Sequence, residues 1–385
     1  MRVAQISRSL EPTRGIAQVA FHLARELTAA GVPVTSLAWF PSPAKKEGAL
    51  GGLRSAPRLA HLFERLGNSR LRLALEVPLF SIWASAQARR LRADHDIVLS
   101  HGDSFTGDAF VAHSCHRAAI AAKRATGGWG WLLNPLHWFV LSRESYNFGR
   151  ARKPWLVAVS RGVAQEYERF YGIPPGRIVC IPNGVDRERY RPAGDKAALR
   201  RELGLPQGER LALFAGHEFA RKGLREAIEG VALCRPDARP WLLVAGGDRP
   251  DRYRALARSA GIEERVRFLG PRADLPRLYA ACDLFLFLSN YESFGLVGLE
   301  ALSAGLPVIT TRVSGVVDYI REEENGLFVE RNGAAVARAL ERLATDGALF
   351  ERLRGNARAS SEAYDWRLVA ARYLTAMERM LAEDV

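Results

Sequence analysis

Short apolar runs alternate with amphipathic stretches along most of the chain. A run of about five apolar residues closed by Gly or polar residues is typical of a buried strand, whereas apolar positions three and four apart indicate a helix that covers a sheet. The alternation predicts an α/β fold with parallel sheets. Strands are expected at residues 3–6, 32–38, 96–102, 109–116, 155–160, 211–216, 241–248, 266–272, 284–288 and 306–310.

Helical spacing marks the segments between these runs. Gly15 opens a helix that Gly31 ends, and the last helix has one apolar face between Trp366 and Leu381. Further helices are expected over 59–92, 274–281, 318–324 and 340–363. The first of these should be interrupted at Pro78, because proline lacks the N–H group that an interior helical position uses.

Length and charge narrow the class of protein. A chain of 385 residues is long enough for two domains, each with its own core. The net charge is +13 and most basic side chains are arginines, so a negatively charged partner is expected. No nucleic-acid-binding motif accompanies this charge, which favours an anionic membrane or glycolipid. An arginine-rich genome composition is the alternative explanation.

The number and spacing of the cysteines indicate whether the protein works in a reducing or an oxidising cellular compartment. Four cysteines, at positions 115, 180, 234 and 282, are scattered without a C-x-x-C pair. This argues against a zinc site or a disulfide framework and fits a reducing compartment. The chain opens on a predicted strand, not on the apolar region of a signal peptide, and no apolar run is long enough to span a bilayer. We therefore expect a cytoplasmic protein.

The most informative stretch is 290–302, which lies between two predicted strands. A helix beginning near Phe294 would present free backbone N–H groups and a partial positive charge, both of which suit a phosphate. Gly295 would let a ligand approach the backbone closely. Glu292 precedes this helix and Glu300 lies within it. The helix is nearly all apolar, and a buried carboxylate needs a hydrogen-bonding partner, for which a ligand is one candidate.

Two cations, Arg221 and Lys222, follow the predicted strand 211–216 and precede a helix. Arginine binds a diphosphate bidentately, and lysine adds a compact charge. The pair is therefore a candidate diphosphate site, with a solvated basic turn as the alternative.

The spacing of Glu292 and Glu300, with Ser293, Phe294 and Gly295 between them, resembles the E-x7-E motif of the retaining family 4 glycosyltransferases. The segments 221–223 and 178–186 also resemble the corresponding segments of that family. Together, 217–224 and 111–118 are most similar to the lipopolysaccharide glucosyltransferases that extend the inner-core heptose. The resemblance covers nearly the whole chain and is weaker in the first half.

This resemblance implies the GT-B fold, with two Rossmann-like domains facing a central cleft and a C-terminal helix that crosses back to the N-terminal domain. We expect residues 1–180, joined by 365–385, to form the acceptor-binding domain. Residues 184–364 should form the nucleotide-sugar donor-binding domain.

The family also implies roles for the motif residues. Glu292 would position the donor sugar and Glu300 would hold the ribose. The amides of Phe294, Gly295 and Leu296 would bind the diphosphate.

Other residues are carried over from the same family. Arg221 and Lys222 would stabilise the departing diphosphate, and Arg272 ends the strand at which relatives hold the nucleobase. In the first half, Gly15 stands where the family usually has a Gly-Gly pair at a phosphate-binding turn. His113 is matched to a histidine or aspartate near the donor sugar, with His101 and His116 as competing positions.

Residues 116–153 combine aromatic residues, short apolar runs and flanking bases. This composition suits a segment that lies on an anionic membrane, with Trp at headgroup depth. A packed helix pair that forms part of the acceptor cleft is an equal alternative. Some lipopolysaccharide-core enzymes of the family carry a membrane-contacting region at this place.

The sequence therefore predicts a retaining enzyme that moves a hexose, most simply glucose, from a UDP-linked sugar to a lipopolysaccharide-core or other envelope glycan. It would act at the inner face of the cytoplasmic membrane. No cofactor, obligatory metal or nucleic acid is expected, because the acidic pair at 94 and 96 merely precedes a strand and no G-x-G-x-x-G motif is present. The alternatives are a nucleotide-sugar epimerase on the same fold and a non-catalytic nucleotide-sugar-binding protein at the membrane surface.

Overall fold

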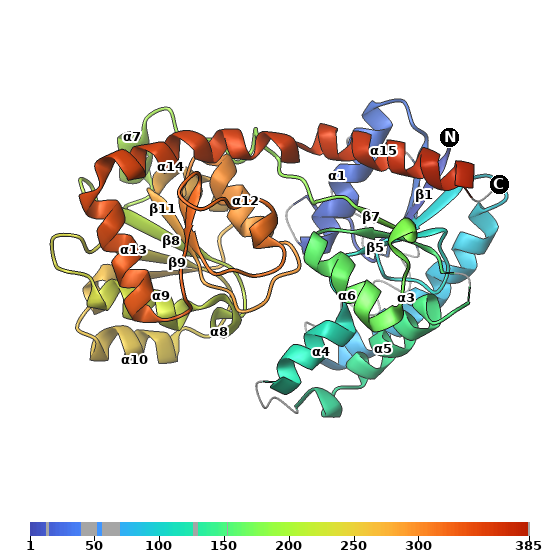
Figure 1. Cartoon of the computed structure of the whole chain (residues 1–385), viewed down its shortest axis with the longest axis horizontal. Helices are drawn as coiled ribbons and strands as arrows, with labels where there is room; N and C mark the ends of the chain where they lie inside the picture. The colour runs from blue at the N-terminus through green and yellow to red at the C-terminus, as the bar shows by residue number, and fades with distance from the viewer. Residues whose placement is uncertain (13–14, 40–51, 56–69, 126–129, 152, 384–385) are drawn as a thin grey trace. The chain divides into compact units, whose positions relative to one another are not determined.

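The computed structural model describes residues 1–12, 15–39, 52–55, 70–125, 130–151 and 153–383. The chain divides into two compact domains. Met1–Gly184 and Trp366–Val385 form the N-terminal domain, and Val185–Asp365 forms the C-terminal domain. Each domain has a parallel sheet covered by helices, which confirms the predicted α/β class with two Rossmann-like domains (Figure 1).

The N-terminal sheet has the strand order β3-β2-β1-β4-β5-β6-β7, and every described pair is parallel. The chain winds outward from β1 in both directions, so the strand order reverses between β1 and β4. The strands are β1 (Val3–Ile6), β2 (Val34–Leu37), β3 (Gly52–Arg54), β4 (Ile97–Ser100), β5 (Ala109–Ala112), β6 (Trp155–Ala158) and β7 (Ile178–Cys180).

Helices of the N-terminal domain begin and end at the expected kinds of residue. Ser160 caps α6 by accepting a hydrogen bond from the Val163 amide, and Gly172 ends that helix in the left-handed conformation (φ 60°). The helices are α1 (Gly15–Ala29), α3 (Arg70–Leu91), α4 (His116–Ala125), η2 (Gly130–Leu133), α5 (Pro135–Phe148), α6 (Arg161–Tyr171), η3 (Pro175–Arg177) and α15 (Trp366–Glu383).

The expected interruption at Pro78 is wrong. Helix α3 continues through this residue, and the part of the prediction that covers 59–69 lies outside the described residues. Phe80 and Ala84 of the next turn pack into a buried cluster with Trp39, which follows β2. Tertiary packing of this face outweighs the missing N–H of a single proline.

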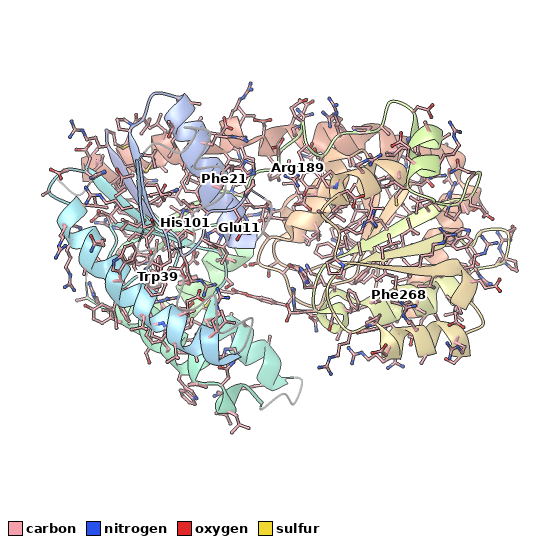
Figure 2. All side chains as sticks on the ribbon, turned by 180° about the vertical axis from the view of Figure 1, so that it is seen from behind. Glu11, Phe21, Trp39, His101, Arg189 and Phe268 are labelled. Atoms are coloured by element: carbon pink, nitrogen blue, oxygen red, sulfur yellow. The ribbon has the colours of Figure 1, made fainter. Side chains whose placement is uncertain are left out.

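The C-terminal sheet has the order β10-β9-β8-β11-β12-β13, again with parallel pairs. Its strand order reverses between β8 and β11, and β10, which carries Phe268, forms one edge (Figure 2). The strands are β8 (Leu211–Ala215), β9 (Trp241–Ala245), β10 (Val266–Gly270), β11 (Leu284–Phe287), β12 (Val308–Thr310) and β13 (Gly326–Phe328).

Two predicted helices of this domain are wrong in detail. The segment 340–363 is split, because Asp346 ends one helix and caps the next by accepting from the Leu349 amide. Only Asp318 of 318–324 is helical, as the last residue of a short 3-10 helix, and the residues after it turn, with the Asn325 side chain bonding to the Arg321 and Tyr319 backbone. The helices are α7 (Lys196–Glu202), α8 (Phe219–Lys222), α9 (Leu224–Leu233), α10 (Asp251–Ser259), η4 (Glu263–Arg265), α11 (Leu275–Ala281), α12 (Leu296–Ser303), η5 (Val316–Asp318), α13 (Gly333–Thr345), α14 (Gly347–Ser360) and η6 (Glu362–Tyr364).

The final helix returns to the N-terminal domain, as predicted, where α15 packs on α1 (Figure 1). Trp366 anchors it: its ring stacks on His22 with 5.2 Å between the ring centroids. A Cβ atom at Gly184 would overlap the Trp366 ring, so glycine is needed at this position. Over the ranges that the structure describes, no helix has both the length and the hydropathy that a membrane crossing requires.

Candidate active site

The predicted residues of the C-terminal domain meet at one place on its sheet. Arg221 and Lys222 follow β8, and Glu292 follows β11. These strands are parallel neighbours, so their carboxyl ends share an edge, and the strand order reverses between them. The crevice at such a reversal is where open α/β sheets bind ligands.

Glu292 accepts three hydrogen bonds through one oxygen. Its Oε1 lies 2.7 Å from Arg221 Nη1, 2.6 Å from Lys222 Nζ and 2.9 Å from Ser289 Oγ. Glu292 and Lys222 are each only 8% exposed. All three bonds converge on Oε1, so among the residues that the structure describes Oε2 is left to receive a donor from a ligand.

The charges of this cluster set one another's pKa values. Burial alone would raise the pKa of Glu292, but Lys222 and Arg221 hold it below its ordinary value. Burial lowers the pKa of Lys222, and Glu292 opposes that effect. The geometry supports a fully ionised trio of Glu292, Lys222 and Arg221, and Arg221 also pairs with Glu218 at 2.9 Å. The two adjacent cations suit an anionic ligand.

Backbone geometry positions the two cations rigidly. Helix α8 is a single turn, and its preceding residue Glu218 has a left-handed conformation (φ 56°). The Phe219 amide donates to Asp248 at 2.8 Å, and the Lys222 ammonium lies 4.7 Å from the centre of the Phe287 ring. These contacts aim both cations at the Glu292 loop.

Helix α12 begins at Leu296, two residues later than predicted, with Gly295 as its N-cap. Gly295 has φ 80°, and a Cβ atom there would lie 2.8 Å from the Phe287 ring. The Tyr319 hydroxyl donates to the Gly295 carbonyl at 2.7 Å. The amides that open α12 are therefore held at the same edge of the sheet as the cationic pair, which is the arrangement a helix N-terminus offers to phosphate.

Glu300 is 6% exposed, as its apolar helix predicted. Its partners come from distant parts of the domain. The Tyr279 hydroxyl lies 3.4 Å from Glu300 Oε2, and Tyr190 also hydrogen-bonds to this carboxylate. Burial raises the pKa of the Tyr190 hydroxyl, and the negative charge of Glu300 raises it further. The carboxylate is thus oriented from the protein side, and its use by a ribose stays a prediction.

Replacing Gly295 with alanine is expected to destabilise the protein by about 1–3 kcal/mol, because alanine is strained at positive φ and its methyl group meets Phe287. Urea unfolding measures the change. Gly355→Ala is the matched control: Gly355 lies in the exposed interior of α14 with open space around it, and alanine there should stabilise by about 0.5–1 kcal/mol. Equal effects of the two substitutions would contradict this description of the turn.

Arg272 lies just beyond β10, at the same edge of the sheet. It forms a bidentate pair with Asp274, in which Nε and Nη2 donate to the two carboxylate oxygens at 2.7 Å each. The structure thus gives this arginine a local partner, and its proposed contact with a nucleobase stays a prediction.

In the N-terminal domain, His113 follows β5 and His101 follows the adjacent strand β4. The sequence offered the two histidines as alternative candidates for the position near the donor sugar. The structure places them side by side. His101 Nδ1 lies 3.0 Å from His113 Nε2, and the rings stack at 5.3 Å. His101 lies in the interior of the domain (Figure 2), and its Nε2 has no partner among the described residues. Gly15 opens α1 after β1, at the same sheet edge.

A cavity of about 200 Å³ adjoins this histidine pair. Glu144 and Arg143 of α5 line it together with the two histidines. Glu144 is buried. Its carboxylate accepts one hydrogen bond from the His116 amide at 2.9 Å and another from the Tyr171 hydroxyl at 2.7 Å. The cavity therefore combines neutral and charged hydrogen-bonding groups, as a sugar-binding pocket requires.

Burial lowers the pKa of His101 and of His113 to about 3, from 6.5. Both are neutral in the fold near pH 7, whereas an unfolded chain protonates them below pH 6.5. Unfolding free energy should therefore fall as pH drops from about 6.5 towards 3, by up to ~1.4 kcal/mol per pH unit for each histidine. His101 is fully buried and should carry the larger share.

The measurement is urea unfolding between pH 7 and pH 5 for the native chain and His101→Gln. The substitution should flatten the pH dependence. An unchanged slope would show that the histidine pair is not held neutral by burial.

Residues 116–153 include α4, η2 and α5, and α4 packs on α5. The packed helix pair expected as one alternative is therefore present. Leu133 and Trp138 are nevertheless 89% and 48% exposed, which leaves apolar side chains on the surface of this segment. Membrane contact through them stays a prediction.

Within the described ranges, no three or more His, Cys, Asp and Glu side chains gather as metal ligands would. Independence from metal stays a prediction. Sequence reasoning missed Ser289, which donates to Glu292 from the same loop, Tyr190 and Tyr279, which hydrogen-bond to Glu300, and Tyr319, which holds the Gly295 carbonyl. No local pattern marks the three tyrosines, because each reaches the site from another part of the chain.

Two family models match the chain. The model described as Glycosyltransferase Family 4 matches residues 13–189, and the model described as Glycosyl transferases group 1 matches residues 195–360. The two matches therefore fall one on each domain.

Curated relatives agree with these matches. A D-inositol 3-phosphate glycosyltransferase from Nocardia farcinica (strain IFM 10152) is 33% identical over 318 residues, 77% of this chain and 69% of the relative. One from Corynebacterium glutamicum (strain R) is 34% identical over 57% of this chain and 56% of the relative. The lipopolysaccharide glucosyltransferase WaaG from Escherichia coli (strain K12) is 30% identical over 57% and 59%. The aligned part of the chain spans about half the length of several curated relatives.

Solved structures match over nearly the full chain. The crystal structure of WaaG superposes with a TM-score of 0.78 at 23% identity and covers 98% of this chain and 99% of that one. Anabaena HepE in complex with UDP and glucose gives a TM-score of 0.71 at 18% identity, covering 98% and 100%. The chain thus belongs to the family 4 glycosyltransferases and has their GT-B fold.

Proposed function

We propose that this protein transfers a hexose, most simply glucose, from a UDP-linked sugar to an envelope glycan, with retention at the anomeric carbon. The observation that carries the proposal is the ionised cluster of Glu292, Arg221 and Lys222 beside the N-terminus of α12. Two relatives support the choice of donor and acceptor: one is named a lipopolysaccharide glucosyltransferase, and one was solved with UDP and glucose.

The cluster supplies the charge stabilisation that the reaction needs. As the bond between the sugar and the diphosphate breaks, negative charge develops on the leaving oxygens. Arg221, Lys222 and the first amides of α12 would stabilise that charge in a buried setting, where such donors act most strongly. Glu292 would hold the sugar through Oε2. The leaving phosphate is the base that we propose for the acceptor hydroxyl, and we assign no covalent nucleophile.

Replacing Glu300 with glutamine should raise the KM for the UDP-sugar by about tenfold or more, because a charged hydrogen bond to the ribose is lost. The effect on kcat should be smaller, since this contact is remote from the breaking bond. Steady-state kinetics with varied donor concentration measure both. A fall in kcat at unchanged KM would contradict the ribose role.

The function itself is tested by product analysis. UDP- and GDP-sugars are offered with extracted envelope glycolipid or with D-inositol 3-phosphate, the latter because of the relatives named for it. We expect transfer from UDP-glucose to the glycolipid, with the anomeric configuration of the donor retained. Epimerised nucleotide sugar, or binding without turnover, would instead support the epimerase or the non-catalytic alternative.

We further propose a cytoplasmic location at the inner membrane face. All four cysteines are free thiols, which fits a reducing compartment. The exposed Leu133 and Trp138 lie within 116–153 and suit shallow insertion among headgroups. Liposome flotation with both residues replaced by serine tests this contact. Undiminished flotation of the double variant would refute it.

A further inference from the structure

A second cavity, of about 530 Å³, lies in the N-terminal domain and plays no part in the proposed transfer reaction. Its volume falls within the usual range for small-molecule sites. Five cationic residues line it, against one acidic residue, Asp108. The cations are Arg89, Arg92, Arg150, Lys153 and Arg177. These residues define what we call the basic pocket.

The basic pocket lies at the amino edge of the sheet. Asp108 directly precedes β5, Pro154 precedes β6 and Arg177 precedes β7. His101 and His113 instead follow β4 and β5, at the carboxyl edge. Strands of four residues are about 13 Å long, so the pocket and the histidine pair lie at opposite ends of the sheet, although Phe110 and Asn147 line both this pocket and the cavity beside the histidines. The pocket is therefore separate from the edge where this fold binds its substrates.

The positive charge of the basic pocket is largely uncompensated. Asp108 forms an ion pair with Arg92, and its second oxygen accepts from the Val98 amide at 2.8 Å. Lys153 Nζ donates to the Phe148 carbonyl, which carries no net charge to cancel that of the lysine. Within the described residues, Arg89, Arg150 and Lys153 have no carboxylate partner.

Many other arginines of this protein are paired. Arg200 with Asp283 and Arg258 with Glu263 are typical of the C-terminal domain. Five positive charges minus one negative charge leave a formal +4 around a single concavity. A concave site lined by one sign of charge concentrates counter-ions, so an anionic ligand is favoured over a neutral one.

The lining indicates which anion fits. Arginine guanidinium groups match phosphate oxygens bidentately, and a single carboxylate would neutralise only a quarter of the formal surplus. Tyr146 and Phe105 add an aromatic wall, and Arg150 stacks 4.0 Å from the centre of the Tyr146 ring. We propose that the basic pocket binds a multiply charged phosphate ester at a site distinct from that of the nucleotide sugar.

Two sources present this chemistry: a soluble phosphate compound and the headgroup of an anionic phospholipid. Inorganic pyrophosphate is the probe for the first, measured by isothermal titration on the full chain. Vesicles of phosphatidylcholine with phosphatidylglycerol are the probe for the second, measured by flotation. Arg89→Gln and Arg150→Gln are the test variants.

Arg90→Gln is the matched control, because Arg90 neighbours Arg89 on α3, is exposed and does not line the pocket. Each test substitution should weaken binding of the true ligand by about tenfold or more, the usual effect of losing a charged hydrogen bond. Binding of pyrophosphate at Arg221 and Lys222 is common to all variants and cancels in the comparison. The outcome is therefore independent of the proposed transferase activity.

A loss confined to the pyrophosphate arm assigns a soluble ligand, and a loss confined to the vesicle arm assigns a lipid headgroup. Thermal unfolding of each variant verifies that it is folded. The proposal is overturned if Arg89→Gln and Arg150→Gln bind both probes as the native chain does. It is equally overturned if Arg90→Gln loses as much affinity as they do, since the effect would then reflect surface charge alone.

Discussion

Replacing Lys222 with glutamine is expected to lower the kcat of glycosyl transfer by about 10²-fold or more, and Arg221→Gln should act similarly. Each substitution removes one donor aimed at the charge that develops on the leaving diphosphate, and the loss of a preorganised donor of this kind costs that much in other enzymes. Lys222 is the more deeply buried of the two, so its removal should have the larger effect. Release of UDP in the presence of acceptor measures the rate.

Arg225→Gln is the control for this series. Arg225 lies on α9, one turn beyond the cationic pair, and its exposed side chain pairs with Glu229. Its replacement removes the same charge without touching Glu292 and should leave the rate nearly unchanged. If Arg225→Gln and Lys222→Gln slowed transfer equally, the role of the cluster in catalysis would be wrong.

The second large effect is on stability. Glu292→Ala should destabilise the protein by about 3 kcal/mol, because it leaves the buried Lys222 without its carboxylate. The estimate lies at the low end for a broken buried ion pair, since Arg221 keeps part of its side chain in water. Urea unfolding of the folded chain measures the difference.

A companion variant separates loss of charge from loss of packing. In Glu292→Leu combined with Lys222→Met, both charges are gone and the volumes are kept, so stability should recover most of the loss. Transfer activity should not recover, because the groups that bind the diphosphate and the sugar are absent. A double variant as unstable as Glu292→Ala would show that packing, not charge, dominates at this site.

The elements around the donor site could be predicted from local patterns. The apolar run before Glu292 forms β11, and the apolar helix after Gly295 buries Glu300. Both signals are local: a strand and a helix are read from runs and spacing, and a positive φ is anticipated from glycine. Arg221 and Lys222 were likewise placed after a strand by the chain order alone.

The partners of these residues could not be predicted in the same way. Glu300, the carboxylate buried in the apolar helix, was expected to need a partner such as a ligand, yet the structure supplies the hydroxyls of Tyr279 and Tyr190 from other elements. His101 and His113 looked like competitors until parallel pairing of β4 with β5 set them side by side. Contacts of this kind depend on strand order, which no local pattern contains.

Helix boundaries failed where tertiary contacts outweigh propensity. Pro78 sits inside a helix because the next turn packs into the core. Asn325, by contrast, uses its side chain to close a turn where spacing had favoured a helix. Tertiary packing therefore decided the first case, and a local side-chain hydrogen bond decided the second.

A crystal structure of the protein soaked with UDP-glucose tests the donor-binding arrangement most directly. We expect the diphosphate to lie against the amides of Phe294, Gly295 and Leu296, with Arg221 and Lys222 within hydrogen-bonding distance of its oxygens. Glu292 Oε2 should face the hexose and Glu300 the ribose. A nucleotide sugar bound elsewhere, or bound here with neither glutamate in contact, would contradict the account.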